Sequence, residues 1–139
     1  MKQVLNYYGV NKSQDTIAKA LGTTTDGTAM SRIPGVLNKY QSKRTYKFYK
    51  YSSKADFEKK VLLSVANGYP VVIDVRTVDY ASQWGYSTKG HFMCISGFNL
   101  NNNKLIVNDP HTRYYGRKSY DSDLVYKVVN AHFNQAIIY

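Results

Sequence analysis

Apolar residues in the first third of the chain recur three and four positions apart, the spacing of one helix face. This pattern predicts three helices, over residues 3–8, 13–22 and 33–40. Ser13 is a typical N-cap residue for the second helix, and Gly22 suits its left-handed C-cap. The chain is therefore expected to begin with a helical half.

The middle of the chain predicts one strand and one further helix. Residues 45–51 are strand-like in composition but rich in lysine, which favours an edge strand of a sheet. Ser53, followed three positions later by Asp56, resembles a capping box. The helix that it opens should carry Phe57 and Val61 on its apolar stripe.

The second half of the chain has the pattern of strands. Apolar runs predict strands over residues 71–75, 91–98, 104–108 and 135–139, with a short helix over residues 122–129. Helices first and antiparallel strands afterwards indicate an α+β fold rather than a doubly wound parallel sheet. We expect N-terminal helices packed on a C-terminal antiparallel sheet.

Composition narrows the class of protein. The chain has 139 residues, which is the length of one domain, and 43% of them are hydrophobic, enough for a core. No stretch approaches the roughly 18 apolar residues of a membrane span. The formal net charge is +10, from 19 basic and 9 acidic residues. This balance fits either an anionic partner or simple solubility.

Candidate chemistry lies in the predicted hairpin of residues 91–98 and 104–108. His91 begins one strand and Asp109 ends the other. If Phe98 faces Lys104, Asp109 faces Met93, and His91 and Asp109 become diagonal neighbours roughly 7–8 Å apart at the backbone. A carboxylate that orients an imidazole is the base half of a catalytic triad. A purely structural His–Asp pair gives the same pattern.

The sequence holds a single cysteine, Cys94. Its odd spacing from His91 puts the two side chains on opposite faces of a strand, so Cys94 is expected to be a buried core residue rather than a nucleophile. No spacing of histidines and acidic residues resembles a metal site, and no cofactor is expected. His111 and His132 are expected to be a loop residue and a packed or solvated residue.

Two further segments leave alternatives open. The loop with Asp79, Trp84 and Gly85 borders a substrate cleft or is anchored by one buried tryptophan. A basic run interleaved with tyrosines has the composition of a single-strand nucleic-acid groove or of a protected sheet edge, and nucleic acid is the weaker interpretation. This run consists of Lys43, Arg44, Lys47, Lys50 and Lys54, with Tyr46, Tyr49 and Tyr51 between them.

Several segments together resemble a known family. They read VLNYYG, SQDTIAKALGTTTDGT and IPGVLNKY in the helical half, and GHFMCISGFN and VNDP in the strand half. In order and type they resemble the C39-like papain-fold cysteine peptidases, relatives of the domains that remove leaders from bacteriocins. The resemblance implies a papain-like fold, with His91 as general base and Asp109 as the residue that orients it.

The resemblance also implies a missing part. In that family the nucleophilic cysteine opens the first long helix, shortly before the segment that matches VLNYYG, and an oxyanion-hole glutamine lies further upstream. Met1 follows both positions. We therefore expect residues 1–139 to be one N-terminally incomplete peptidase-like domain that is inactive by itself. A shortened helical half would also favour domain swapping between copies.

Three functions remain compatible with these residues. The first is a cysteine peptidase that acts on a peptide or protein substrate through a Cys-His-Asp triad in the complete protein. The second is a pseudopeptidase module that binds a peptide without cutting it. The third is a basic binding protein for an anionic polymer, whose affinity would fall steeply with salt.

Overall fold

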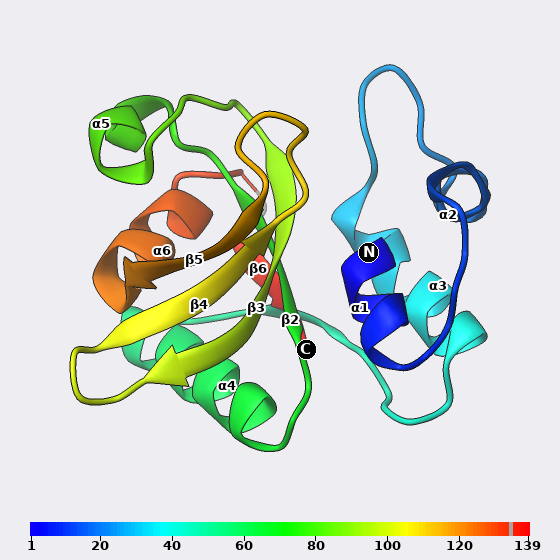
Figure 1. Ribbon diagram of the computed structural model, residues 1–139, viewed down its shortest axis with the longest axis horizontal. Helices are drawn as coiled ribbons and strands as arrows, with labels where there is room; N and C mark the ends of the chain where they lie inside the picture. The colour runs from blue at the N-terminus through cyan, green and yellow to red at the C-terminus, as the bar shows by residue number, and fades with distance from the viewer. Residues whose placement is uncertain (134) are drawn as a thin grey trace.

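The computed structural model describes residues 1–133 and 135–139 (Figure 1). The helices are α1 (Lys2–Tyr7), α2 (Gln14–Leu21), α3 (Ile33–Tyr40), α4 (Lys54–Ala66), α5 (Ala81–Trp84) and α6 (Ser122–Asn130), with short 3-10 turns at Met30–Arg32 and Val78–Tyr80. The strands are β1 (Phe48–Lys50), β2 (Val71–Val75), β3 (His91–Asn99), β4 (Lys104–Asp109), β5 (Gly116–Asp121) and β6 (Ala136–Ile138).

The strands form one antiparallel sheet in the order β1-β6-β2-β3-β4-β5. Helices α1, α2 and α3 lie together on one side of the sheet, whereas α4 and α6 cover the other side (Figure 1). The expected α+β fold, with N-terminal helices on an antiparallel sheet, is confirmed. The second helical layer follows from the burial of the central strand.

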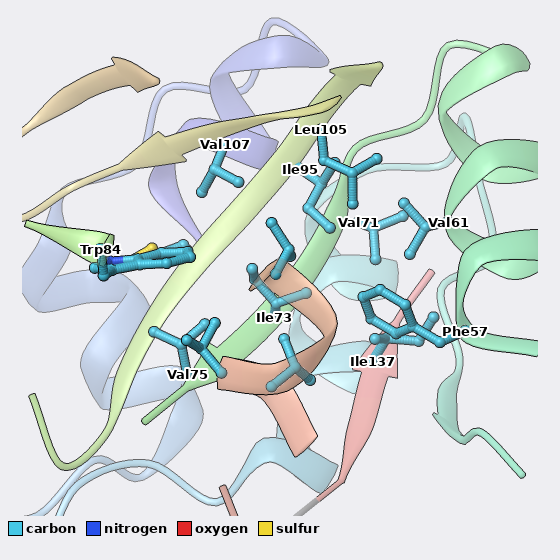
Figure 2. Close-up of a cluster of buried hydrophobic side chains, with 14 of the residues drawn as sticks. Phe57, Val61, Val71, Ile73, Val75, Trp84, Ile95, Leu105, Val107 and Ile137 are labelled. Atoms are coloured by element: carbon cyan, nitrogen blue, oxygen red, sulfur yellow. The ribbon is translucent and has the colours of Figure 1, made fainter. Parts of the chain in front are cut away.

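Strand β2 is buried along its whole length. Val71, Ile73 and Val75 point into the core beneath α4 and α6, which also contains Phe57 (Figure 2). Val72, one step out of phase, belongs to the core beneath the first three helices. The alternation of side chains along a strand therefore requires apolar cover on both faces of the sheet.

Local sequence accounts for the helix ends. The Ser13 side chain accepts a hydrogen bond from the Thr16 backbone N–H at 3.1 Å, and Gly22 ends α2 with φ of +62°. The Ser53 side chain accepts from the Asp56 N–H at 3.1 Å and opens α4. Both caps satisfy amide groups that the first turn of a helix leaves without a partner, as the sequence predicts.

Strand β1 is an edge strand, as its lysines predict, and it pairs only with β6 among the described strands. The tyrosines that flank β1 pack within the fold. Tyr46 is 1% exposed and donates a hydrogen bond to the Pro70 carbonyl at 3.0 Å. Tyr51 packs edge-on against Phe57. The buried ring of Tyr46 does not offer a stacking surface to nucleobases, and the half-buried ring of Tyr51 is already packed on Phe57.

The β3–β4 hairpin differs from the expected register close to its turn. Phe98 faces Leu105 instead of Lys104. A bulge between Ile95 and Gly97 then shifts the pairing by one residue, so that Cys94 faces Asn108. Beyond the bulge the register agrees with the prediction, because the extra residue on β3 compensates for the different turn.

Strand β5 and helix α5 are not anticipated by the sequence patterns. The residues of β5 alternate between half-buried and exposed and are mostly polar, so the strand carries little apolar signal. It forms the outer edge of the sheet beside β4. The short α5 ends in Trp84, whose ring stacks on Tyr120 of β5 at 4.1 Å between centroids.

A pair of phenylalanines tests the core. Phe57→Ala should lower the free energy of unfolding by about 3–5 kcal/mol, because the ring is fully buried and its removal leaves a cavity. Phe133→Ala, which truncates a ring that is 84% exposed, should change it by less than about 0.5 kcal/mol. Urea unfolding of both variants measures the difference, and equal losses would contradict the assignment of this core.

Candidate active site

His91 and Asp109 meet at one end of the β3–β4 hairpin. Continuing the pairing of Cys94 with Asn108 by one step brings Asp109 opposite Met93, two residues from His91. The His91 Nε2 atom lies 2.9 Å from Asp109 Oδ1, within hydrogen-bond distance. The two residues that the sequence singles out are therefore in contact.

The Asp109 carboxylate is 2% exposed but has several donors around it. The Tyr86 hydroxyl donates to Oδ2 at 2.6 Å, and the His111 backbone N–H donates to Oδ1 at 2.8 Å. With the His91 contact, both carboxylate oxygens have partners, which a buried carboxylate requires. Burial, and then the hydrogen bond to Asp109, raise the pKa of Tyr86 above its usual value, so that it remains a donor.

Tyr86 is a site residue that the sequence patterns missed. It follows the loop glycine Gly85 and gives no periodic signal of its own. Its ring stacks on Tyr114 at 4.5 Å between centroids, with nearly parallel planes. The stacking supports the Tyr86 ring, whose hydroxyl donates to Asp109.

His111 is a loop residue, as expected, and it supports the loop with its ring. Its Nδ1 atom accepts hydrogen bonds from the backbone N–H groups of Arg113 and Tyr114, at 3.1 and 3.3 Å. The His111 ring also contacts the His91 ring edge-on, with 5.6 Å between centroids. It therefore limits the freedom of the His91 imidazole.

The two ring nitrogens of His91 have different surroundings. Because Nε2 points to the Asp109 carboxylate, the proton of the neutral ring is best placed on Nε2. Nδ1 is then the nitrogen with a lone pair that can accept a proton. The imidazole is 23% exposed and reaches the surface.

A hollow of about 430 Å³ opens beside His91. One side of the hollow is formed by His91 and Phe92 of β3 and by Pro110 after β4. The other side is formed by residues in and around the first three helices: Met1, Lys2, Gln3, Asn6, Gln14, Ile17, Ala18, Leu21, Thr23, Thr28 and Ile33. Apolar side chains with a few polar groups are typical of a ligand-binding cleft. The cleft brings the start of α1 to the same space as His91.

Cys94 lies on the other face of β3, in the core beneath the first three helices, whereas Met93 and Ile95 point to the opposite core. Its thiol is buried and is 3.5 Å from the Gln3 side-chain oxygen. Burial raises the pKa of this thiol above its usual value. Cys94 is thus unsuited to form a thiolate or to reach His91.

The loop before β3 matches the second of its two interpretations. Trp84 is 2% exposed, and Asp79 forms an ion pair of 3.8 Å with Arg76. Neither these residues nor Gly85 lines the cleft beside His91. The loop is anchored by its buried tryptophan and does not contribute to the cleft in this structure.

A second His–Asp contact lies inside the protein. His132 Nδ1 is 3.3 Å from Asp74 Oδ2, and both side chains are buried. The expectation that His132 is merely packed or solvated is incomplete, because it pairs with the one charged residue of β2. Asp74 within a buried apolar strand was the signal, since a buried carboxylate needs a partner.

Residues 1–133 and 135–139, which the structure describes, contain neither a metal-binding cluster nor a membrane-spanning helix. No group of three or more His, Cys, Asp or Glu side chains in this part of the chain is arranged to hold a metal ion. Among the same residues, no helix is both long and apolar enough to cross a bilayer.

Sequence comparison identifies the family. The model of the Peptidase_C39 like family matches residues 1–136, so the chain belongs to this family of cysteine peptidase-like domains. No curated protein matches the chain. Membership of a peptidase-like family is consistent with a peptide as substrate.

The fold is similar to that of a solved peptidase domain. It matches the peptidase domain of Streptococcus ComA, a bifunctional ABC transporter involved in a quorum-sensing pathway, with a TM-score of 0.66. The match covers 99% of this chain and 84% of that chain at 17% sequence identity. The likeness confirms the papain-like fold expected from the sequence.

Tyrosine substitutions test whether the Tyr86 hydroxyl stabilises the buried Asp109 carboxylate. Tyr86→Phe should lower the free energy of unfolding by about 1.5–3 kcal/mol, because it removes a donor from a buried carboxylate. Tyr115→Phe is the matched control, since that side chain is 73% exposed, and it should be nearly neutral. Thermal or urea unfolding compares them; a neutral Tyr86→Phe would contradict the role of the hydroxyl.

Thiol chemistry tests the environment of Cys94. In the folded protein at pH 8, iodoacetamide should modify Cys94 at least roughly tenfold more slowly than in urea, because burial disfavours the thiolate and blocks access. Mass spectrometry of the peptide that contains Cys94 follows the reaction. Equal rates in the folded and unfolded protein would show an accessible thiol instead.

Proposed function

We propose that this domain supplies the general base and the substrate cleft of a cysteine peptidase whose nucleophilic cysteine precedes Met1. His91 acts as the general base and Asp109 orients it. The single observation that carries the proposal is the 2.9 Å contact between His91 Nε2 and the buried Asp109 carboxylate, at the rim of a cleft. Membership of a peptidase family supports the same reading.

The position of the cleft makes this chemistry feasible. Met1, Lys2 and Gln3, at the start of α1, line the cleft together with His91. A residue on a helical extension of α1 would therefore approach the imidazole from the helix side. A thiol near a helix N-terminus and an imidazole has a lowered pKa, which favours the attacking thiolate.

The reaction follows from these placements. His91 Nδ1 takes the thiol proton, and the thiolate adds to the carbonyl carbon of the scissile peptide bond. The imidazolium then gives the proton to the departing amine, which leaves an acyl-enzyme thioester. A water molecule, deprotonated by His91, hydrolyses the thioester and restores the thiol. Asp109 holds the tautomer and stabilises the imidazolium throughout.

The 139 residues are proposed to be inactive by themselves. Their single thiol, Cys94, is buried on the face of β3 away from the His91 side chain. Without a thiolate within reach, His91 has no nucleophile to activate. The same observation favours a second candidate, a pseudopeptidase that binds a peptide in the cleft and does not cut it.

The test uses the protein from its native source. Intact mass and N-terminal peptide sequencing define the natural N-terminus, and an upstream cysteine at the head of α1 is expected. His91→Ala in that protein should reduce peptide cleavage by roughly 10²–10⁴-fold, because the general base is lost. Alkylation of the upstream cysteine should abolish cleavage.

Asp109→Asn and Asp79→Asn form a matched pair for the same assay. The first removes the charge that orients His91, and the second removes an exposed carboxylate that pairs with Arg76. Cleavage should fall only with Asp109→Asn, in protein shown by circular dichroism to be folded. If the natural protein begins at Met1 and binds a peptide without cleaving it, the pseudopeptidase is correct and the peptidase proposal is wrong.

A further inference from the structure

The end of the sheet opposite the His91–Asp109 pair carries a basic hollow of about 400 Å³. Its lining residues are Lys43, Arg44, Thr45, Lys47, Tyr69 and Tyr139. Tyr69 lies two residues before β2 begins at Val71, whereas His91 pairs with Val75 at the other end of that strand. At ~3.3 Å per residue these strand ends are about 13 Å apart. The hollow is therefore separate from the cleft beside His91.

Arg44 is held in place within this hollow before any ligand is present. The buried side chain of Gln41 donates to the Arg44 carbonyl at 2.6 Å and accepts from the Arg44 backbone N–H at 2.9 Å. The guanidinium stacks on the Tyr69 ring, with 4.3 Å to its centroid. A side chain fixed in this way loses little conformational entropy when it binds a ligand.

One donor of this guanidinium is unsatisfied. The Arg44 Nε atom is buried and has no hydrogen-bond partner among residues 1–133 and 135–139. Such groups are rare in folded proteins, because a buried donor without an acceptor is unfavourable. Because solvent does not reach this atom, the terminal N–H groups of the guanidinium, rather than Nε, are the donors for an anion in the hollow.

The surrounding charge favours an anion. No acidic residue occurs from Gly27 to Ala55. Lys43 and Lys47 are exposed and form no ion pair within the part of the chain that the structure describes. Their positive charges therefore add to that of Arg44.

We propose that this hollow is a binding site for a phosphate group. The planar fork of Arg44 matches two phosphate oxygens, and the ammonium groups of Lys43 and Lys47 complement the remaining charge. The Thr45 hydroxyl is an additional donor in the lining. Stacking of a nucleobase is not part of the site, because Tyr46 is buried and Tyr49 packs on Tyr139.

The phosphate can belong to a soluble compound or to a phospholipid headgroup, and the experiment separates these sources. The natural full-length protein is titrated with inorganic phosphate at constant ionic strength, and the Arg44 Nε–H resonance is followed by NMR. A saturable shift of this resonance is expected. Sedimentation with phosphatidylglycerol vesicles, with phosphatidylcholine vesicles as the neutral reference, then shows whether the headgroup is the source.

Two pairs of substitutions separate a built site from diffuse positive charge. Lys43→Gln with Lys47→Gln should weaken phosphate binding at least about tenfold, equivalent to ~1.4 kcal/mol. Lys19→Gln with Arg117→Gln removes the same charge from exposed positions elsewhere, and should leave binding within about twofold. Arg44→Lys keeps the charge but lacks the fork, and should also weaken binding.

The outcomes are distinguishable. A saturable shift that is lost in the Lys43 and Lys47 variant supports the site, with vesicle binding assigning it to a headgroup and no vesicle binding to a soluble phosphate. The absence of a saturable shift overturns the proposal. Equal weakening by both double variants, in protein with unchanged thermal unfolding, also overturns it, because net charge alone would then explain the binding.

Discussion

Burial of β2 on both of its faces is the constraint on which the architecture depends. All five residues from Val71 to Val75 are buried. A strand of this kind needs apolar cover on both sides, so α4 and α6 pack on one face and the first three helices on the other. The same burial obliges Asp74 to pair with His132, which ties the segment after α6 to the centre of the sheet.

The candidate active site depends on this sheet in a more specific way. His91 pairs with Val75 at the end of β2, which fixes where β3 begins. The bulge between Ile95 and Gly97 then sets which residue of β4 lies opposite, and it brings Asp109 within 2.9 Å of His91. A register one residue different would turn the carboxylate to the other face of the sheet. Hydrogen bonds from the Tyr86 hydroxyl and the His111 N–H offset the cost of burying the Asp109 carboxylate.

The two ends of the sheet present opposite chemistry. At one end, a buried carboxylate orients a histidine at the rim of a mainly apolar cleft. At the other end, Arg44 and two lysines line a polar hollow. A ligand at the proposed phosphate site would leave the cleft beside His91 open, because the two lie at opposite ends of β2.

The sequence by itself determined the caps of α2 and α4, most strands and the two residues of the His–Asp pair, because caps, periodicity and side-chain alternation are local signals. It also indicated that Cys94 faces away from His91, because side chains three positions apart on a strand lie on opposite faces. Only the tertiary structure decided the role of Tyr86, the pairing of His132 and the isolation of the Arg44 Nε donor. Each of these depends on contacts between segments far apart in the chain, which local sequence patterns do not predict.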